Sequence, residues 1–138
     1  MLYLVGTDGS PVSDTAVEYA AQLADRWNAS LTIVHVLTPE TILVDGTIVL
    51  PGEKEALDWG EETLERARSI AGEASDGLEA RTELLTGRPA DSITEHAESI
   101  DADGIIVGHR GESMDYDRVG SVAKSVVDKA TIPVTIVK

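Results

Sequence analysis

The sequence predicts a single α/β domain in which a parallel sheet carries helices on both faces. Apolar runs typical of buried strands alternate along the chain with longer segments of helical periodicity, and strands that run parallel need such crossover helices between them. The 138 residues are 42% hydrophobic, which suits one domain, 1–138, with a core of its own. Glycine-rich turns at residues 6–10 and 108–111 directly follow two of the apolar runs.

The first strand and the first helix are expected in the N-terminal part of the chain. Residues 2–5 form a continuous apolar run, as expected of a strand buried on both faces. Ser10 or Ser13 can cap the helix that follows, and Pro11 suits its first turn. Apolar residues then recur at helical spacing until Asn28, where the helix is expected to end.

The middle of the chain predicts two strands and a long helix. The second strand covers residues 30–37, and a loop with two prolines and two glycines is expected at 38–52. The second helix runs from about 53 to 74, and Gly60 weakens it locally. Residues 78–85 alternate between apolar and charged side chains, which indicates a third strand with one exposed face, at an edge of the sheet.

The last third of the chain predicts two more helices and two more strands. They are a helix at about 90–100, a strand at 104–108, a loop at 109–119, a helix at about 121–130 and a strand at 132–137. Sites in parallel sheets lie beyond the carboxyl ends of the strands, where the strand order reverses. The glycine-rich turns after the first and fourth strands are therefore the expected place for a site.

The chain is strongly acidic, with 25 acidic and 11 basic residues and a formal net charge of −14. Such a charge repels nucleic-acid phosphate and anionic lipid, so no nucleic-acid or membrane partner is expected. An ordinary acidic cytosolic protein is one interpretation of this charge, but the scarcity of lysine favours a halophile, whose salty cytoplasm screens the charge. The N-terminal apolar run is too short to span a bilayer and lacks the basic start of a signal peptide, and the chain has no cysteine. A cytoplasmic protein is therefore expected.

A pattern typical of phosphate binding lies between the fourth strand and the last helix. Gly108-His109-Arg110-Gly111 is followed by eight residues and then by Gly120 and Ser121 at a helix start. Glycines let the backbone approach a ligand, free N–H groups at a helix start favour an anion, and Arg110 adds positive charge. His109 is the histidine expected near a ligand. An ordinary strand-to-helix loop would use the same glycines.

Asp8, directly after the first strand, is a second candidate. Its carboxylate can accept a hydrogen bond from a ribose hydroxyl or approach a phosphate-bound Mg²⁺. It can equally turn the chain or cap the following helix. The sequence contains no GxxxxGK[ST], GxGxxG or GxSxG motif, and its three histidines are too dispersed to suggest a metal cluster. No catalytic residue and no metal ligand is therefore predicted.

Taken in order along the whole chain, these segments resemble the universal stress protein family. The motifs that carry the resemblance are Val5-Gly6-Thr7-Asp8-Gly9-Ser10, His35-Val36, Gly108-His109-Arg110-Gly111, Gly120-Ser121-Val122-Ala123 and Ile132-Pro133-Val134-Thr135-Ile136-Val137-Lys138. The resemblance implies a Rossmann-like, five-stranded sheet with strand order 3-2-1-4-5. As in many members of the family, it also implies ATP binding and a homodimer formed through the last strand, 132–137.

The resemblance further implies a set of nucleotide-binding residues at the family's ribose, adenine and phosphate positions. They are Thr7, Asp8, Val36, Gly108, Arg110, Gly111, Gly120, Ser121 and Val122. One departure is the loop between the second and third glycines, which has eight residues where the ATP-binding pattern has nine. Three of the eight are acidic, and carboxylates repel a triphosphate. AMP, ADP or another adenine nucleotide, with or without Mg²⁺, is the alternative to ATP.

Three functional hypotheses follow from this sequence. The first is a nucleotide-binding stress-response or regulatory protein whose protein partners are unknown. The second is a nucleotide-free, dimeric interaction or signalling module of the same fold, which the shortened acidic loop supports. The third is an enzyme such as a weak ATPase, whose hydrolysis would be slow because no base positioned for water is evident.

Overall fold

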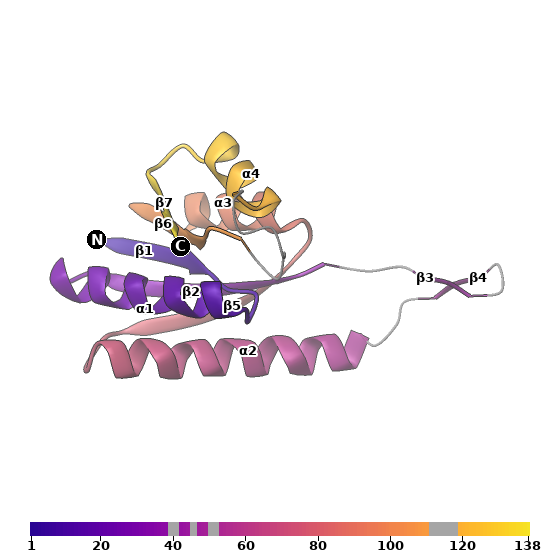
Figure 1. The fold of residues 1–138 in the computed structure, drawn as a ribbon, viewed down its shortest axis with the longest axis horizontal. Helices are drawn as coiled ribbons and strands as arrows, with labels where there is room; N and C mark the ends of the chain where they lie inside the picture. Colours follow the sequence, from indigo (N-terminus) through magenta and orange to yellow (C-terminus); the bar gives the residue numbers. More distant parts are fainter. Residues whose placement is uncertain (39–41, 45–46, 50–52, 111–118) are drawn as a thin grey trace.

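The computed structural model describes residues 1–38, 42–44, 47–49, 53–110 and 119–138 of the chain. Figure 1 shows a twisted sheet with helices on both sides. The elements, in chain order, are β1 (Leu2–Gly6), α1 (Pro11–Arg26), β2 (Ser30–Leu37), β3 (Ile42–Val44), β4 (Thr47–Val49), α2 (Glu53–Ala74), β5 (Ala80–Thr86), α3 (Pro89–Ser99), β6 (Gly104–Gly108), α4 (Ser121–Lys129) and β7 (Val134–Val137).

The large sheet has five strands in the order β5-β2-β1-β6-β7, and every neighbouring pair is parallel. Counted along the chain without the small hairpin, this is the order 3-2-1-4-5, so the predicted fold class is confirmed. The first strand is central: Tyr3 pairs with Leu31 of β2 on one side and with Gly104 of β6 on the other.

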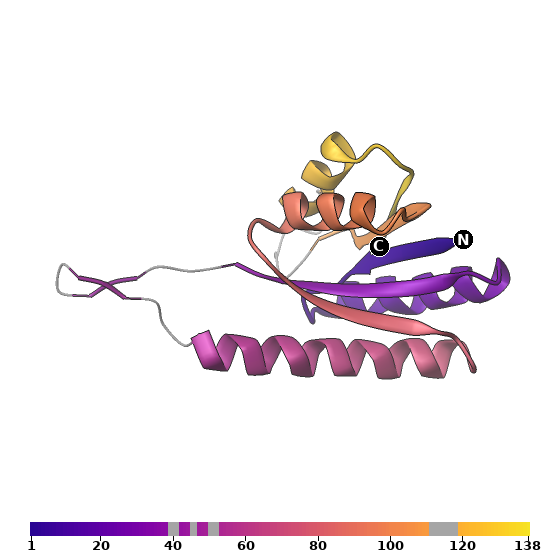
Figure 2. The same ribbon diagram turned by 180° about the vertical axis from the view of Figure 1, so that it is seen from behind.

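The helices cover the sheet in two pairs. α1 and α2 pack on one face, and α3 and α4 pack on the other (Figures 1 and 2). Successive side chains of a strand point to opposite faces of the sheet. In β1, Val5 therefore belongs to the core under α1 and α2, whereas Leu4 belongs to the core under α3 and α4. Both side chains are fully buried. The continuous apolar run at 2–5 is therefore the mark of a strand covered on both faces.

The two edges of the sheet are β5 and β7, which confirms the edge position expected for the third strand. Along β5, Arg81 and Glu83 are exposed, and Thr82 and Leu84, which alternate with them, are half-buried. The predicted helix ends also hold to within one or two residues. α1 ends at Arg26, and Asn28 follows with a left-handed φ of 52°, a conformation that asparagine tolerates better than most residues.

The segment between β2 and α2 differs from the expected loop. β3 and β4 form an antiparallel two-stranded sheet in which Leu43 pairs with Ile48, and Figure 1 shows this hairpin beyond the carboxyl end of β2. The sequence signal was the pair Asp45-Gly46 between two apolar runs, a combination that favours two-residue hairpin turns. The prolines and glycines around it indicated a loop instead.

In the part of the chain that the structure describes, no helix has the length and apolar character required to cross a bilayer.

Candidate functional site

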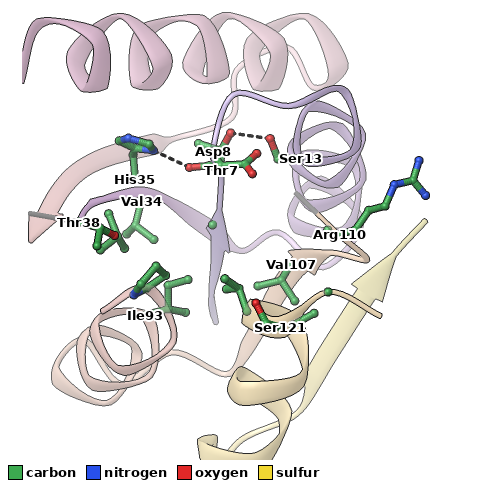
Figure 3. Close-up of a pocket in the computed structure, with 17 residues that line it drawn as sticks. Thr7, Asp8, Ser13, Val34, His35, Thr38, Ile93, Val107, Arg110 and Ser121 are labelled. Carbon is green, nitrogen blue, oxygen red and sulfur yellow. Dashed lines mark hydrogen bonds between the residues drawn. The ribbon is translucent and has the colours of Figure 1, made fainter. Parts of the chain in front are cut away.

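A cavity of about 420 Å³ lies at the carboxyl ends of β1, β2 and β6 (Figure 3). Strand ends, helix starts and one side chain of α1 form its wall. The lining residues are Gly6, Thr7, Asp8, Ser13, Val34, His35, Val36, Thr38, Pro89, Ile93, Val107, Gly108, Arg110, Gly120, Ser121, Val122 and Ala123.

The position of the cavity follows from the strand order. The chain leaves β1 towards β2 and leaves β6 towards β7, so the order reverses between the adjacent strands β1 and β6. The loops after these two strands diverge to opposite faces of the sheet, and a crevice opens between them. A cavity therefore lies at the place expected for the site, between the two glycine-rich turns.

The turn after β1 has a fixed conformation. Its backbone is bonded to β2, because Thr7 N donates to Val34 O at 2.9 Å. Within the turn, Thr7 Oγ1 accepts from Gly9 N at 3.2 Å, and Asp8 Oδ1 accepts from Ser10 N at 2.9 Å. One carboxylate oxygen of Asp8 therefore holds the turn, while the half-buried residue lines the cavity. Both of the roles expected for Asp8, in the turn and at the site, are compatible with this geometry.

His35 is the histidine beside the cavity. Its ring is buried, and its Nδ1 lies 2.8 Å from the carbonyl oxygen of Thr7. Because a carbonyl only accepts, Nδ1 carries the proton in this contact. His109, which was expected near a ligand, is buried and is not among the lining residues. Its backbone joins β7 and Gly120 instead, through His109 N to Val137 O at 2.7 Å and Gly120 N to His109 O at 2.6 Å.

The glycines of the predicted motif are required by close packing. A Cβ on Gly108 would lie 3.0 Å from Cγ1 of Val12, and a Cβ on Gly120 would lie 3.0 Å from the Cα of Arg110. The second contact is with backbone, which cannot rotate away as a side chain can. Gly120 thus brings the start of α4 against the end of β6, where both border the cavity.

The start of α4 offers free backbone donors to the cavity. Gly120 is its N-cap and provides no capping side-chain bond, and the first turn holds no acidic residue. The first backbone bond of the helix runs from Lys124 N to Gly120 O at 3.1 Å. The N–H groups of residues 121–123 precede it and have no acceptor within the helix. With the helix dipole, they make this end attractive to an anion.

Most of the predicted site residues are brought together here. Thr7, Asp8, Val36, Gly108, Arg110, Gly120, Ser121 and Val122 all line the cavity. Gly111 lies outside the described residues, as does the acidic part of the loop. The side chain of Arg110 points away from the cavity in Figure 3, so its backbone contributes more to the wall than its charge does.

Sequence reasoning missed lining residues of the strands, of the helices and of the position directly after β2. They are Gly6, Ser13, Val34, Thr38, Pro89, Ile93, Val107 and Ala123. Strand periodicity could have indicated Val34, because it points to the same face as Val36. Ile93 has no such local signal, since its contact with Gly6 exists only once α3 packs on the sheet: a Cβ on Gly6 would lie 3.1 Å from Ile93 Cδ1.

The cavity suits a ligand with an apolar part, hydroxyl groups and an anionic end. Val34, Val36 and Ile93 provide apolar surface, Asp8 provides a carboxylate acceptor, and the start of α4 provides donors. Within the described ranges, no group of three histidine or carboxylate side chains is arranged to hold a metal ion.

Comparison with known proteins adds a family. The model of the "Universal stress protein family" matches residues 3–138. A universal stress protein of Methanocaldococcus jannaschii is 34% identical, over 98% of this chain and 80% of that protein.

Two solved structures are similar over the whole chain. The universal stress protein of Archaeoglobus fulgidus in complex with dAMP has a TM-score of 0.78 at 29% identity, covering 100% of this chain and 98% of that one. A universal stress protein in complex with cAMP has a TM-score of 0.79 at 26% identity, covering 100% and 97%.

Proposed function

This chain belongs to the universal stress protein family, and from that membership we propose that it is an adenine-nucleotide-binding stress-response or regulatory protein. The observation that carries the proposal is the uncapped start of α4, which borders the same cavity as the carboxylate of Asp8. One end of the cavity is thus suited to phosphate and another to a ribose hydroxyl.

The proposed pose assigns each part of the nucleotide to a described group. The phosphate accepts from the backbone N–H groups of residues 121–123 and from the exposed hydroxyl of Ser121. The ribose donates to the oxygen of Asp8 that Ser10 N leaves free. The adenine lies along Val36, in the apolar part of the cavity. In the two structures cited above, family members bind dAMP and cAMP, which supports an adenosine ligand.

We further propose that a monophosphate binds more tightly than ATP. A monophosphate carries about two negative charges at neutral pH, and the donors of one helix start can satisfy it. A triphosphate carries more charge, and three of the eight residues 112–119 that separate the glycines of the motif are acidic. Mg²⁺ would be needed to offset that repulsion, so ATP binding should depend on the cation.

The test is to measure nucleotide in the purified protein and then to titrate the emptied protein with AMP, ATP and Mg-ATP by calorimetry in molar KCl. Gly120→Val, which drives its side chain into the backbone of Arg110, should raise the Kd for AMP by more than about tenfold, a loss above about 1.4 kcal/mol. Gly72→Val is the matched control, because a Cβ there meets nothing within 4 Å.

The opposite result would favour the second hypothesis. No co-purifying nucleotide and no binding up to millimolar concentration would leave a nucleotide-free interaction module of the same fold. Turnover of ATP by the protein alone, lost in Ser121→Ala or Asp8→Ala, would instead indicate an enzyme.

A further inference from the structure

The turn that carries Asp8 is held from outside the cavity by one face of α2. Gly9 has a left-handed φ of 82° and turns its Cα towards that helix. A methyl group on this Cα would lie in ordinary van der Waals contact, 3.5 Å, with both Thr63 Cγ2 and Trp59 Cζ2, so both side chains lie beside the turn. Trp59, Thr63 and Arg66 are spaced i, i+4, i+7 and therefore share one face of α2.

Arg66 extends this contact with polar bonds. Its Nη1 donates to the carbonyl oxygen of Gly9 at 3.4 Å, and its Nη2 forms an ion pair with Asp14 of α1. One guanidinium thus joins α2 both to the turn and to the helix that the turn enters. The pair is exposed, so its net contribution to stability is small, but the bond to Gly9 O places a donor on the residue directly after Asp8.

Trp59 reaches the other side of Asp8 through His35. The two rings meet edge to face, with centroids 5.1 Å apart and planes at 70°. His35 in turn donates from Nδ1 to the carbonyl oxygen of Thr7 at 2.8 Å. The residues before and after Asp8 are therefore both restrained by groups in contact with Trp59.

We propose that Trp59, Thr63 and Arg66 are positioning residues. They hold the Asp8 carboxylate at the place where it accepts a hydrogen bond from the ribose of the bound nucleotide. The inference rests on the proposed function and adds a determinant of affinity to it. None of the three residues lines the cavity, so they act on the ligand through the turn that carries Asp8. Since a preformed site loses less entropy on binding, loosening the turn weakens binding without removing any ligand contact.

The experiment uses a ligand that cannot be recognised by Asp8. Calorimetry compares AMP with 2′,3′-dideoxy-AMP for the wild type, Trp59→Leu and Arg66→Met. We expect each substitution to raise the Kd for AMP by roughly threefold to tenfold, the range that about 0.7–1.4 kcal/mol gives, and to leave the Kd for the dideoxy nucleotide unchanged. A general structural defect would weaken both ligands equally.

Two matched controls make the same chemical changes elsewhere. Trp27→Leu removes an exposed tryptophan that caps the far end of α1, and Arg68→Met removes an arginine of α2 that bonds Thr82 and Glu65. Both should bind AMP as the wild type does. Trp59 is 48% exposed and the Arg66 side chain is 54% exposed. Because substitutions at exposed positions change stability little, the test variants are expected to fold.

A double-mutant cycle with Asp8→Ala completes the test, because coupled residues give non-additive effects. In that background, Trp59→Leu and Arg66→Met should have no further effect on the Kd for AMP. Two results would overturn this inference alone. In the first, Trp59→Leu and Arg66→Met bind AMP with the Kd of the wild type. In the second, the two substitutions raise the Kd for AMP in the Asp8→Ala background by the same factor as in the wild type. A wild type that binds neither nucleotide would overturn the proposed function, and the inference with it.

Discussion

Asp91 shows how a single residue joins two helices that form part of the site. It lies in the first turn of α3, and its carboxylate pairs with Lys129 in the last turn of α4. The hydrogen bond from Lys129 holds the pKa of Asp91 below its usual value, and the charges of Lys129 and Arg88 add to this effect against a smaller cost of desolvation. The starts of α3 and α4 both border the cavity, so this pair joins two helices that contribute to its wall.

The lowered pKa gives a pH dependence with a definite sign. A carboxyl whose pKa is lower in the folded state stabilises the fold above its unfolded pKa of about 4, and this contribution is lost as the pH falls through the folded pKa. Asp91→Asn should therefore have a lower urea midpoint than the wild type at pH 7, and the difference should shrink below about pH 4. Asp25→Asn, on the exposed side of α1, is the control. A difference that is constant with pH would contradict the assignment.

At the scale of an element, α2 contains two glycines with opposite roles. A Cβ on Gly60 would lie 2.9 Å from Leu84 Cδ1 and 3.3 Å from His35 Cδ2, whereas a Cβ on Gly72 would meet nothing within 4 Å. Gly60 is buried and lets α2 approach β2 and β5 closely. The sequence reading of Gly60 as a weak point of the helix considered only propensity, and the structure supplies the packing reason for it.

The two glycines provide a paired prediction. Gly72→Ala should stabilise the protein by about 0.5–1 kcal/mol, because alanine is the better helix former and the site is open. Gly60→Ala should destabilise it by about 1–3 kcal/mol, the usual cost of overpacking a core. Chemical unfolding followed by circular dichroism measures both. Two changes of the same sign would show that propensity, not packing, controls this helix.

The predictable part of the fold is the part that local periodicity determines. The run at 2–5, the alternation at 78–85 and the helical spacing of α1 each gave the correct element, because burial on two faces, on one face or along a stripe leaves a pattern in the sequence. The hairpin at 42–49 was missed because its turn signal lies within a segment rich in prolines and glycines.

The site was predictable where it consists of backbone at strand ends. Gly108 ends β6, Gly120 directly precedes α4 and Asp8 lies two residues after β1, and the topology brings them together. The position of His109 outside the lining of the cavity was not predictable, since it depends on packing among neighbours distant in the chain. The face of α2 against Gly9 was missed for the same reason.

At the scale of the whole molecule, β7 forms one edge of the sheet. Within the residues that the structure describes, no strand pairs with its outer side. Pro133 O accepts from Ile105 N of β6, and Val137 O accepts from His109 N directly after that strand. By alternation, the backbone groups of Val134 and Ile136 therefore face outwards. The four residues of β7 are each half-buried, and an unpaired apolar edge invites pairing with another chain. We propose that β7 pairs with the same strand of a second copy to form a homodimer.

Light scattering in molar salt tests this dimer. Thr135→Lys places a charge in the middle of the edge, a substitution that natural edge strands use against pairing, and it should halve the measured mass. Thr131→Lys makes the same change in the turn before β7 and should leave the mass unchanged. A monomeric wild type would exclude the proposed pairing.

The central position of β1 also has a consequence for the time course of synthesis. β1 pairs with Ser30 onwards on one side and with Gly104 onwards on the other, and a ribosome that adds about 5–20 residues per second needs roughly 4 to 15 s to make the chain between them. During that interval the nascent half-sheet exposes the edge where β6 will lie, and chaperones would have to protect it. The cavity does not exist until β6 and α4 have been made, so a ligand can stabilise only the nearly finished protein.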